Sequence, residues 1–203
     1  WGSVNVAVFK NDYENFIESL ATAPAFAGSG GIDPADGLLT FQSVNLSEVE
    51  IKGLEFSGEL SLAPLNDSLE GSAFKFALAY AEGENIAAAE PLDSIEPLSA
   101  VFGLTYDAPS GKWGGDLVFS LAKGKDASDI NSTSARNETY CYGSIDLMSS
   151  LQVSVSDRAN SGLFNVTDKQ YVRWADTAGV GADAIERFSQ PGINARIDLR
   201  VEI

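Results

Sequence analysis

The last eleven residues of the chain alternate strictly between apolar and polar side chains. The apolar side chains occupy every odd position: Ile193, Ala195, Ile197, Leu199, Val201 and Ile203. A period of two is typical of a β-strand whose two faces meet different surroundings. Such a strand fits a soluble protein, in which the apolar face lies in the core. It equally fits an outer-membrane β-barrel, in which the apolar face meets lipid and the polar face meets a wet lumen.

Alternation of the same kind recurs along the chain and predicts seven earlier strands, so that eight are expected in all. We place them at residues 2–18, 53–62, 73–80, 100–106, 116–121, 144–153 and 161–174, with the eighth at 193–203. The connections are long at 19–39, 82–96, 123–139 and 175–190, and short at 63–70, 107–112 and 155–157. Antiparallel strands would put all the long connections at one end, which is typical of outer-membrane barrels with long extracellular loops.

Each predicted strand has one apolar face, and five bulky positions on it are expected to face lipid: Phe56, Phe76, Phe102, Phe119 and Leu199. Tyr106 and Trp113 flank a short connection, as in the aromatic girdle of a membrane interface. Ordinary aromatic strand residues would give the same pattern at either position.

The opposite face is rich in Gly, Ser and Ala and also carries charged side chains. We expect nine charged positions to face the lumen or a plug: Glu55, Glu59, Lys75, Asp116, Asp146, Arg196, Asp198, Arg200 and Glu202. Small side chains would underfill an eight-stranded barrel, whose interior is just wide enough for side chains to fill. The pattern therefore indicates a wider barrel or a plug supplied from elsewhere.

Composition excludes several classes of function. The formal net charge of −16 repels phosphate backbones, so we expect no nucleic-acid partner. The chain has no histidine, which removes the usual general base and the usual zinc and haem ligand. Its one cysteine, Cys141, forms no intrachain disulfide and fits no metal-binding spacing. No stretch approaches the ~20 consecutive apolar residues of a transmembrane helix, whereas a barrel strand needs only ~9–11 residues.

Candidate sites for chemistry give weak signals. Glu55 and Glu59 on one strand lie roughly 13 Å apart, which is too far for the carboxylate pair of a glycosidase. Residues 126–131 place oxygen ligands at alternating positions but lack the glycine and the final glutamate of an EF-hand loop, which favours a solvated loop. We therefore expect no catalytic residues, no metal site and no cofactor.

Four blocks of sequence resemble a known family. Residues 163–174 read Leu-Phe-Asn-Val-Thr-Asp-Lys-Gln-Tyr-Val-Arg-Trp, and a Gln-Pro-Gly block at 190–192 precedes the last strand. Residues 49–56 read Val-Glu-Ile-Lys-Gly-Leu-Glu-Phe, and residues 9–17 read Phe-Lys-Asn-Asp-Tyr-Glu-Asn-Phe-Ile. In order and spacing these blocks resemble TonB-dependent outer-membrane receptors of the haemoglobin, haem and transferrin branch. The matching positions are Gly53, Asn165, Asp168, Tyr171, Trp174, Pro191 and Gly192.

The roles of Asn165, Asp168 and Tyr171 have two interpretations. The three side chains could form a polar cluster that binds a ligand. Asn and Asp also hold local turns through side-chain bonds to the backbone, so we favour a structural role at the transition from strand to loop.

The resemblance implies a 22-stranded barrel closed by an N-terminal plug, of which residues 1–203 would be the C-terminal part with the last eight strands. The plug and the TonB-contacting segment are absent, so we expect a piece of a longer protein. The implied function is TonB-dependent, energy-coupled import of haem or an iron-carrying ligand across the outer membrane of a Gram-negative bacterium. The implied partners are TonB, the plug, outer-membrane lipid and the extracellular ligand. Ile193 and Ile203 depart from the family, which commonly has arginine and phenylalanine there.

Other interpretations stay open at this point. A complete eight-stranded membrane barrel would serve as an anchor or an adhesin. A soluble β-sandwich would bind its ligand in solution. An enzyme would need a convergent His, Cys or carboxylate site, and we find none in the sequence.

Overall fold

The computed structural model describes residues 1–22, 32–38, 40–132, 134, 136–154 and 157–201. Its strands are β1 (Gly2–Thr22), β2 (Phe41–Ser61), β3 (Ser72–Asn85), β4 (Glu90–Pro91), β5 (Ser99–Asp107), β6 (Trp113–Ala122), β7 (Tyr142–Gln152), β8 (Arg158–Phe164) and β9 (Asn194–Arg200). Short 3-10 helices lie in the connections: η2 (Ala63–Leu65), η3 (Asp67–Leu69), η4 (Ala127–Asp129), η5 (Trp174–Thr177) and η6 (Ile185–Phe188). None of the helices in these described ranges has the length and apolar character to cross a membrane.

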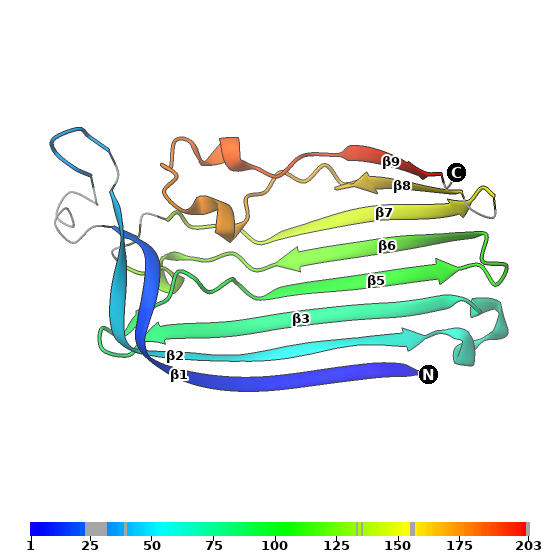
Figure 1. Ribbon diagram of the computed structural model, residues 1–203, viewed down its shortest axis with the longest axis horizontal. Helices are drawn as coiled ribbons and strands as arrows, with labels where there is room; N and C mark the ends of the chain where they lie inside the picture. Colours follow the sequence, from blue (N-terminus) through cyan, green and yellow to red (C-terminus); the bar gives the residue numbers. More distant parts are fainter. Residues whose placement is uncertain (23–31, 39, 133, 135, 155–156, 202–203) are drawn as a thin grey trace.

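The long strands form one antiparallel sheet in which each strand lies beside its neighbours in sequence (Figure 1). The order is β1-β2-β3-β5-β6-β7-β8-β9, and β4 pairs only with β3. All described strands belong to this sheet, so the second packed layer of a β-sandwich is missing from the described residues and that interpretation is wrong. The described parts of β1 and β9 do not pair with each other, so the described residues do not form a closed eight-stranded barrel. The predicted antiparallel sheet of consecutive long strands is confirmed.

The first two strands are longer than predicted. β1 continues to Thr22, and β2 begins at Phe41 rather than near Gly53. Their far ends form a hairpin that rises away from the rest of the sheet (Figure 1). Most of the predicted 19–39 connection lies outside the described residues. The predicted 82–96 connection is also shorter, because β3 continues to Asn85 and β4 folds back onto it.

The predicted strand at 161–174 is wrong over most of its length. β8 begins earlier, at Arg158, and ends at Phe164. Asn165 and Asp168 both adopt a φ of 50°. A left-handed backbone cannot continue an extended strand, so these two residues end β8 and open a long connection.

The register places the five predicted lipid-facing positions on one face of the sheet, called the apolar face below. Phe76 pairs with Phe102, and Phe102 pairs with Phe119. Residues that pair across antiparallel strands share a face, so these rings form a continuous row. The ring centroids of Phe56 and Phe76 lie 4.9 Å apart. Leu199 joins the same face through its pairing with Ala159 of β8.

The opposite face of the sheet, called the polar face below, holds the charged positions singled out in the sequence. Glu59 pairs with Lys75 directly, and successive pairings across β5 and β6 place Asp146 in the same row. The positions that the register puts on this face are Glu55, Glu59, Lys75, Asp116, Asp146, Arg196, Asp198 and Arg200. Glu202 lies outside the described residues.

Burial is sparse and lies mostly at one end of the sheet. Among the described residues the buried apolar side chains are Val49, Leu92, Ala108 and Trp174. Side chains of the apolar face remain open, for example Val6 at 63% and Leu199 at 73% exposure. An apolar face with no covering layer needs apolar surroundings from outside the chain.

Candidate functional site

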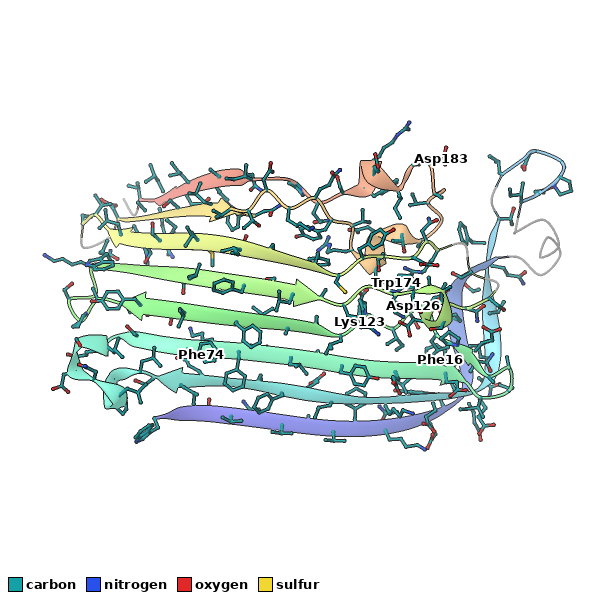
Figure 2. All side chains as sticks on the ribbon, turned by 180° about the vertical axis from the view of Figure 1, so that it is seen from behind. Phe16, Phe74, Lys123, Asp126, Trp174 and Asp183 are labelled. Atoms are coloured by element: carbon teal, nitrogen blue, oxygen red, sulfur yellow. The ribbon has the colours of Figure 1, made fainter. Side chains whose placement is uncertain are left out.

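The long connections gather at one end of the sheet, as the sequence predicts (Figure 1). They join β1 to β2, β3 to β5, β6 to β7 and β8 to β9, whereas the opposite end has the connections at 62–71, 108–112 and 153–157. Figure 2 shows Lys123, Asp126 and Trp174 at this loop end, away from Phe74. Loops carried on a rigid sheet are the usual place for a binding site, so the loop end is the first candidate.

Trp174 lies at the centre of this end and is 2% exposed. Its indole N–H donates a 2.9 Å hydrogen bond to the backbone carbonyl of Asp93. The Lys125 Nζ lies 4.7 Å from the ring centroid, and the Arg136 Cζ lies 4.6 Å from it. Two cations thus contact one indole at cation–π distance, and the indole N–H is satisfied.

Hydrogen bonds also connect the connections that meet at Trp174. The Arg136 Nη1 donates to the Trp174 carbonyl at 2.8 Å, and the Asn137 Nδ2 donates to the Val180 carbonyl at 2.6 Å. The Asp93 Oδ1 accepts from the backbone N–H of Asn131 at 3.0 Å. We call Asp93, Lys125, Arg136 and Trp174 the Trp174 cluster. It joins the β3–β5, β6–β7 and β8–β9 connections into one packed unit.

The charges around the cluster are balanced by neighbours. Burial lowers the pKa of the Lys125 ammonium, and the carboxylates of Asp93 and Asp129 oppose this shift. At the rim, the Glu90 carboxylate accepts from both the hydroxyl and the backbone N–H of Ser132, and these bonds lower its pKa. Such an arrangement holds loops in place. Among the described residues no group of three or more His, Cys, Asp or Glu side chains could hold a metal ion.

Asn165 and Asp168 connect the start and the end of the last long connection. Asn165 is 5% exposed, and its Nδ2 donates to the carbonyls of Lys169 at 2.9 Å and Pro191 at 3.0 Å. The Asp168 Oδ1 accepts from the backbone N–H of Ile193 at 2.8 Å, just before β9. A Cβ on Gly192 would overlap this carboxylate oxygen, so a larger residue there would displace the carboxylate from its bond to Ile193.

Two other positions of the family motif, Tyr171 and Gly53, lie in closely packed surroundings. Tyr171 stacks on Tyr142 with ring centroids 4.0 Å apart. A Cβ on Gly53 would overlap the Phe9 ring. Asp126 accepts from the Ser128 backbone N–H at 3.0 Å and caps η4, so in this structure its carboxylate serves the loop itself.

The polar face forms a second candidate surface, in the half of the sheet that lies opposite the loop end. Asp116, Arg158, Arg196 and Asp198 line a hollow of about 360 Å³, together with Lys75. Arg196 and Asp198 form an ion pair at 2.9 Å. Its lining also includes Gly114, Gly115 and Gly162, which have no side chains to fill the hollow.

Several of these residues escape sequence reasoning. Asp93, Lys125 and Arg136 lie in separate connections, and nothing in their local sequence relates them to Trp174. The sequence pattern begins this strand at residue 161 and so misses Arg158, which is the first residue of β8 and pairs with Arg200. Only the family resemblance singled out Trp174.

Comparisons with known proteins agree with this architecture. Residues 1–181 match the family model described as TonB dependent receptor-like, beta-barrel. Hemoglobin-haptoglobin-binding protein A of Haemophilus influenzae is 25% identical over 99% of this chain and 21% of its own length. Hemoglobin-haptoglobin utilization protein B of Neisseria meningitidis serogroup C is 25% identical over 94% of this chain and 27% of its own length. The chain therefore spans about a quarter of the curated relatives named here.

Solved structures show the same fold. The copper transporter OprC matches 100% of this chain and 29% of its own with a TM-score of 0.77 at 20% identity. A mutant of the ferric enterobactin receptor of Pseudomonas aeruginosa matches 98% of this chain and 28% of its own, with a TM-score of 0.66 at 23% identity. The family model covers most of the chain, so the chain belongs to the TonB-dependent receptor β-barrel family.

Proposed function

We propose that this chain is the closing part of an outer-membrane receptor that imports haem or an iron-carrying ligand. One observation carries the proposal: a single antiparallel sheet has an uncovered apolar face and long loops at one end only. An apolar band outside and long loops at the extracellular end are what an outer-membrane barrel needs. The names of the haemoglobin-binding relatives support the ligand class.

The proposed placement is the outer membrane of a Gram-negative bacterium, with the Trp174 cluster on the extracellular side. TonB and the plug would act through the remainder of the protein, and lipid would cover the apolar face. The complete barrel would have 22 strands, of which this chain supplies the last eight. The chain would present its loops to the ligand, close the barrel and line the lumen. We assign it no catalytic step.

Growth on different iron sources tests the ligand class. A strain that lacks the full-length receptor is expected to lose growth on haemin and on haemoglobin as sole iron sources, and to keep growth on ferric salts. Loss of TonB should give the same phenotype, because the import is energy-coupled. Normal growth on haem sources, combined with loss of growth on a siderophore, would contradict the proposed ligand.

We also propose that the polar face lines the lumen and contacts the plug. Glu55 and Glu59 lie on this face, and the Glu59 carboxylate lies 3.9 Å from the Lys75 Nζ with both side chains more than half exposed. Such an exposed pair contributes little, so Glu59 can accept a second cation. Plug arginines would give charge-assisted bonds to these carboxylates.

The double variant Glu55→Gln with Glu59→Gln in the full-length receptor is expected to loosen the plug and leave barrel assembly intact. Outer-membrane permeability to large antibiotics should rise, and amide exchange in the plug should speed up. Asp67→Asn with Glu70→Gln, in the exposed turn between β2 and β3, changes the charge equally and should have no effect. Wild-type permeability and plug protection in the first variant would mean that these carboxylates are merely hydrated.

A further inference from the structure

A lateral cavity of about 480 Å³ lies where β3 and β5 separate, at the loop end of the sheet. We propose that it binds the phosphate-bearing headgroup of an outer-leaflet lipid, together with a divalent cation. The residues that matter are Lys52, Tyr80, Glu82, Ile95, Lys123 and Asp129. The proposal rests on the outer-membrane placement given above and adds a lipid ligand to it.

The cavity exists because two paired strands diverge. The β3–β5 pairing ends at Ala79 and Ser99, so the β3 backbone beyond Ala79 has no β5 partner. Leu92 and Ile95 pack behind this gap. A Cβ on Gly83 would lie 2.9 Å from the Leu92 Cδ1 and 2.7 Å from the Ile95 Cγ1. The gap in the sheet therefore has an apolar floor made by the β3–β5 connection.

The cavity also marks the level at which the apolar face ends. Val8, Leu54 and Tyr80 form one cross-strand row on that face. The next row toward the loops is charged and consists of Lys10, Lys52 and Glu82. The following row, Asp12, Glu50 and Glu84, is entirely acidic. A change from apolar to charged side chains between one row and the next is expected at the boundary between acyl chains and headgroups.

The lysines at the cavity are available to an anion. The Lys52 Nζ lies 3.3 Å from a Glu82 carboxylate oxygen and 3.8 Å from a Glu50 oxygen. The Lys123 Nζ lies 3.6 Å from an Asp129 oxygen. The Lys52 and Lys123 side chains are 53% and 57% exposed, so these ion pairs are weak and open to exchange. The Tyr80 hydroxyl donates to Glu82 beside them.

The ligand must carry groups that pair with the lysines of the cavity and groups that pair with its carboxylates. Carboxylates outnumber lysines around the cavity, so a bare phosphate would be repelled. A divalent cation held by one or two carboxylates and by phosphate oxygens removes this repulsion and matches the way Mg²⁺ is usually bound. Leu54, Leu78 and Leu121 continue the apolar face below the cavity and offer a surface for acyl chains, which favours a lipid over a soluble phosphate.

The amount of lipid phosphate that stays bound to the purified receptor measures the occupancy of the cavity. The full-length receptor is purified from outer membranes in detergent, washed, and assayed for glycolipid phosphate per molecule. Lys52→Gln with Lys123→Gln is expected to lower tightly retained phosphate roughly tenfold, which corresponds to about 1.4 kcal/mol. A wash with EDTA should lower the wild type to the same level. The control, Lys112→Gln with Lys169→Gln, removes two exposed lysines that do not line the cavity and should retain wild-type phosphate.

Three results would overturn the inference. They are unchanged phosphate in the Lys52/Lys123 variant, unchanged phosphate after EDTA, and displacement of the lipid by millimolar inorganic phosphate with Mg²⁺. The last result would identify a site for free phosphate. Receptor that supports growth on haemoglobin but fails these tests would refute only the lipid site, whereas receptor absent from the outer-membrane fraction would refute the proposed function.

Discussion

Replacing Trp174 with alanine is expected to release the loop end while the sheet stays intact. The indole is buried, donates to Asp93, and contacts both Lys125 and Arg136, so its removal leaves a cavity and two uncovered cations. Removal of a buried tryptophan costs about 3–5 kcal/mol. Hydrogen exchange followed by mass spectrometry should show much faster exchange at residues 86–98 and 123–141. The variant should also bind the extracellular ligand more weakly, because the entropy cost of ordering the loops is then paid on binding.

Trp113→Ala provides the matched control, because Trp113 is 53% exposed and lies at the opposite end of the sheet. Its ring packs against Tyr106 with centroids 4.8 Å apart, and its loss should leave exchange in the long loops unchanged. Trp174→Phe retains a ring for the two cations but lacks the N–H donor, so an intermediate effect is expected. Equal loop protection in wild type and Trp174→Ala would show that the three connections are held independently of the cluster.

The two faces of the sheet were predictable from sequence because a strand alternates with a period of two. That rule needs only neighbouring residues, and it puts Phe76, Phe102 and Phe119 on apolar faces that the strand pairing then joins into one. The ends of strands were less predictable. Tyr171 and Val172 favour a strand locally, yet Asn165 adopts a left-handed conformation that serves bonds to Asp146 and Pro191.

The loop cluster could not be predicted for a different reason. Asp93, Lys125, Arg136 and Trp174 come together only because antiparallel strands return their connections to one end of the sheet. No periodicity relates residues that lie in three separate loops. The alternation of long and short connections does predict that the long loops share one end of the sheet, where binding sites usually lie.

Arginine in place of Phe102 is expected to destabilise the folded protein by about 2–4 kcal/mol if its face meets lipid. Phe102 lies in the middle of the aromatic row, between Phe76 of β3 and Phe119 of β6. A guanidinium there must lose its hydration, with no carboxylate on the same row to pair with it. The free energy of unfolding of the full-length receptor in phospholipid vesicles, measured by denaturant titration, gives the magnitude directly.

Val101→Arg is the control, because Val101 is the neighbouring residue and points to the polar face. Its cross-strand partners there are Ala77 and Ser120, which are small and leave room for a long side chain. In a wet lumen the arginine can remain hydrated, so its cost should stay well below that of Phe102→Arg. The reverse order, with Val101→Arg the more destabilising, would mean that the apolar face is covered by protein and the polar face meets lipid. Such a result would refute the barrel orientation and the lipid site together, because both depend on which face is turned outward.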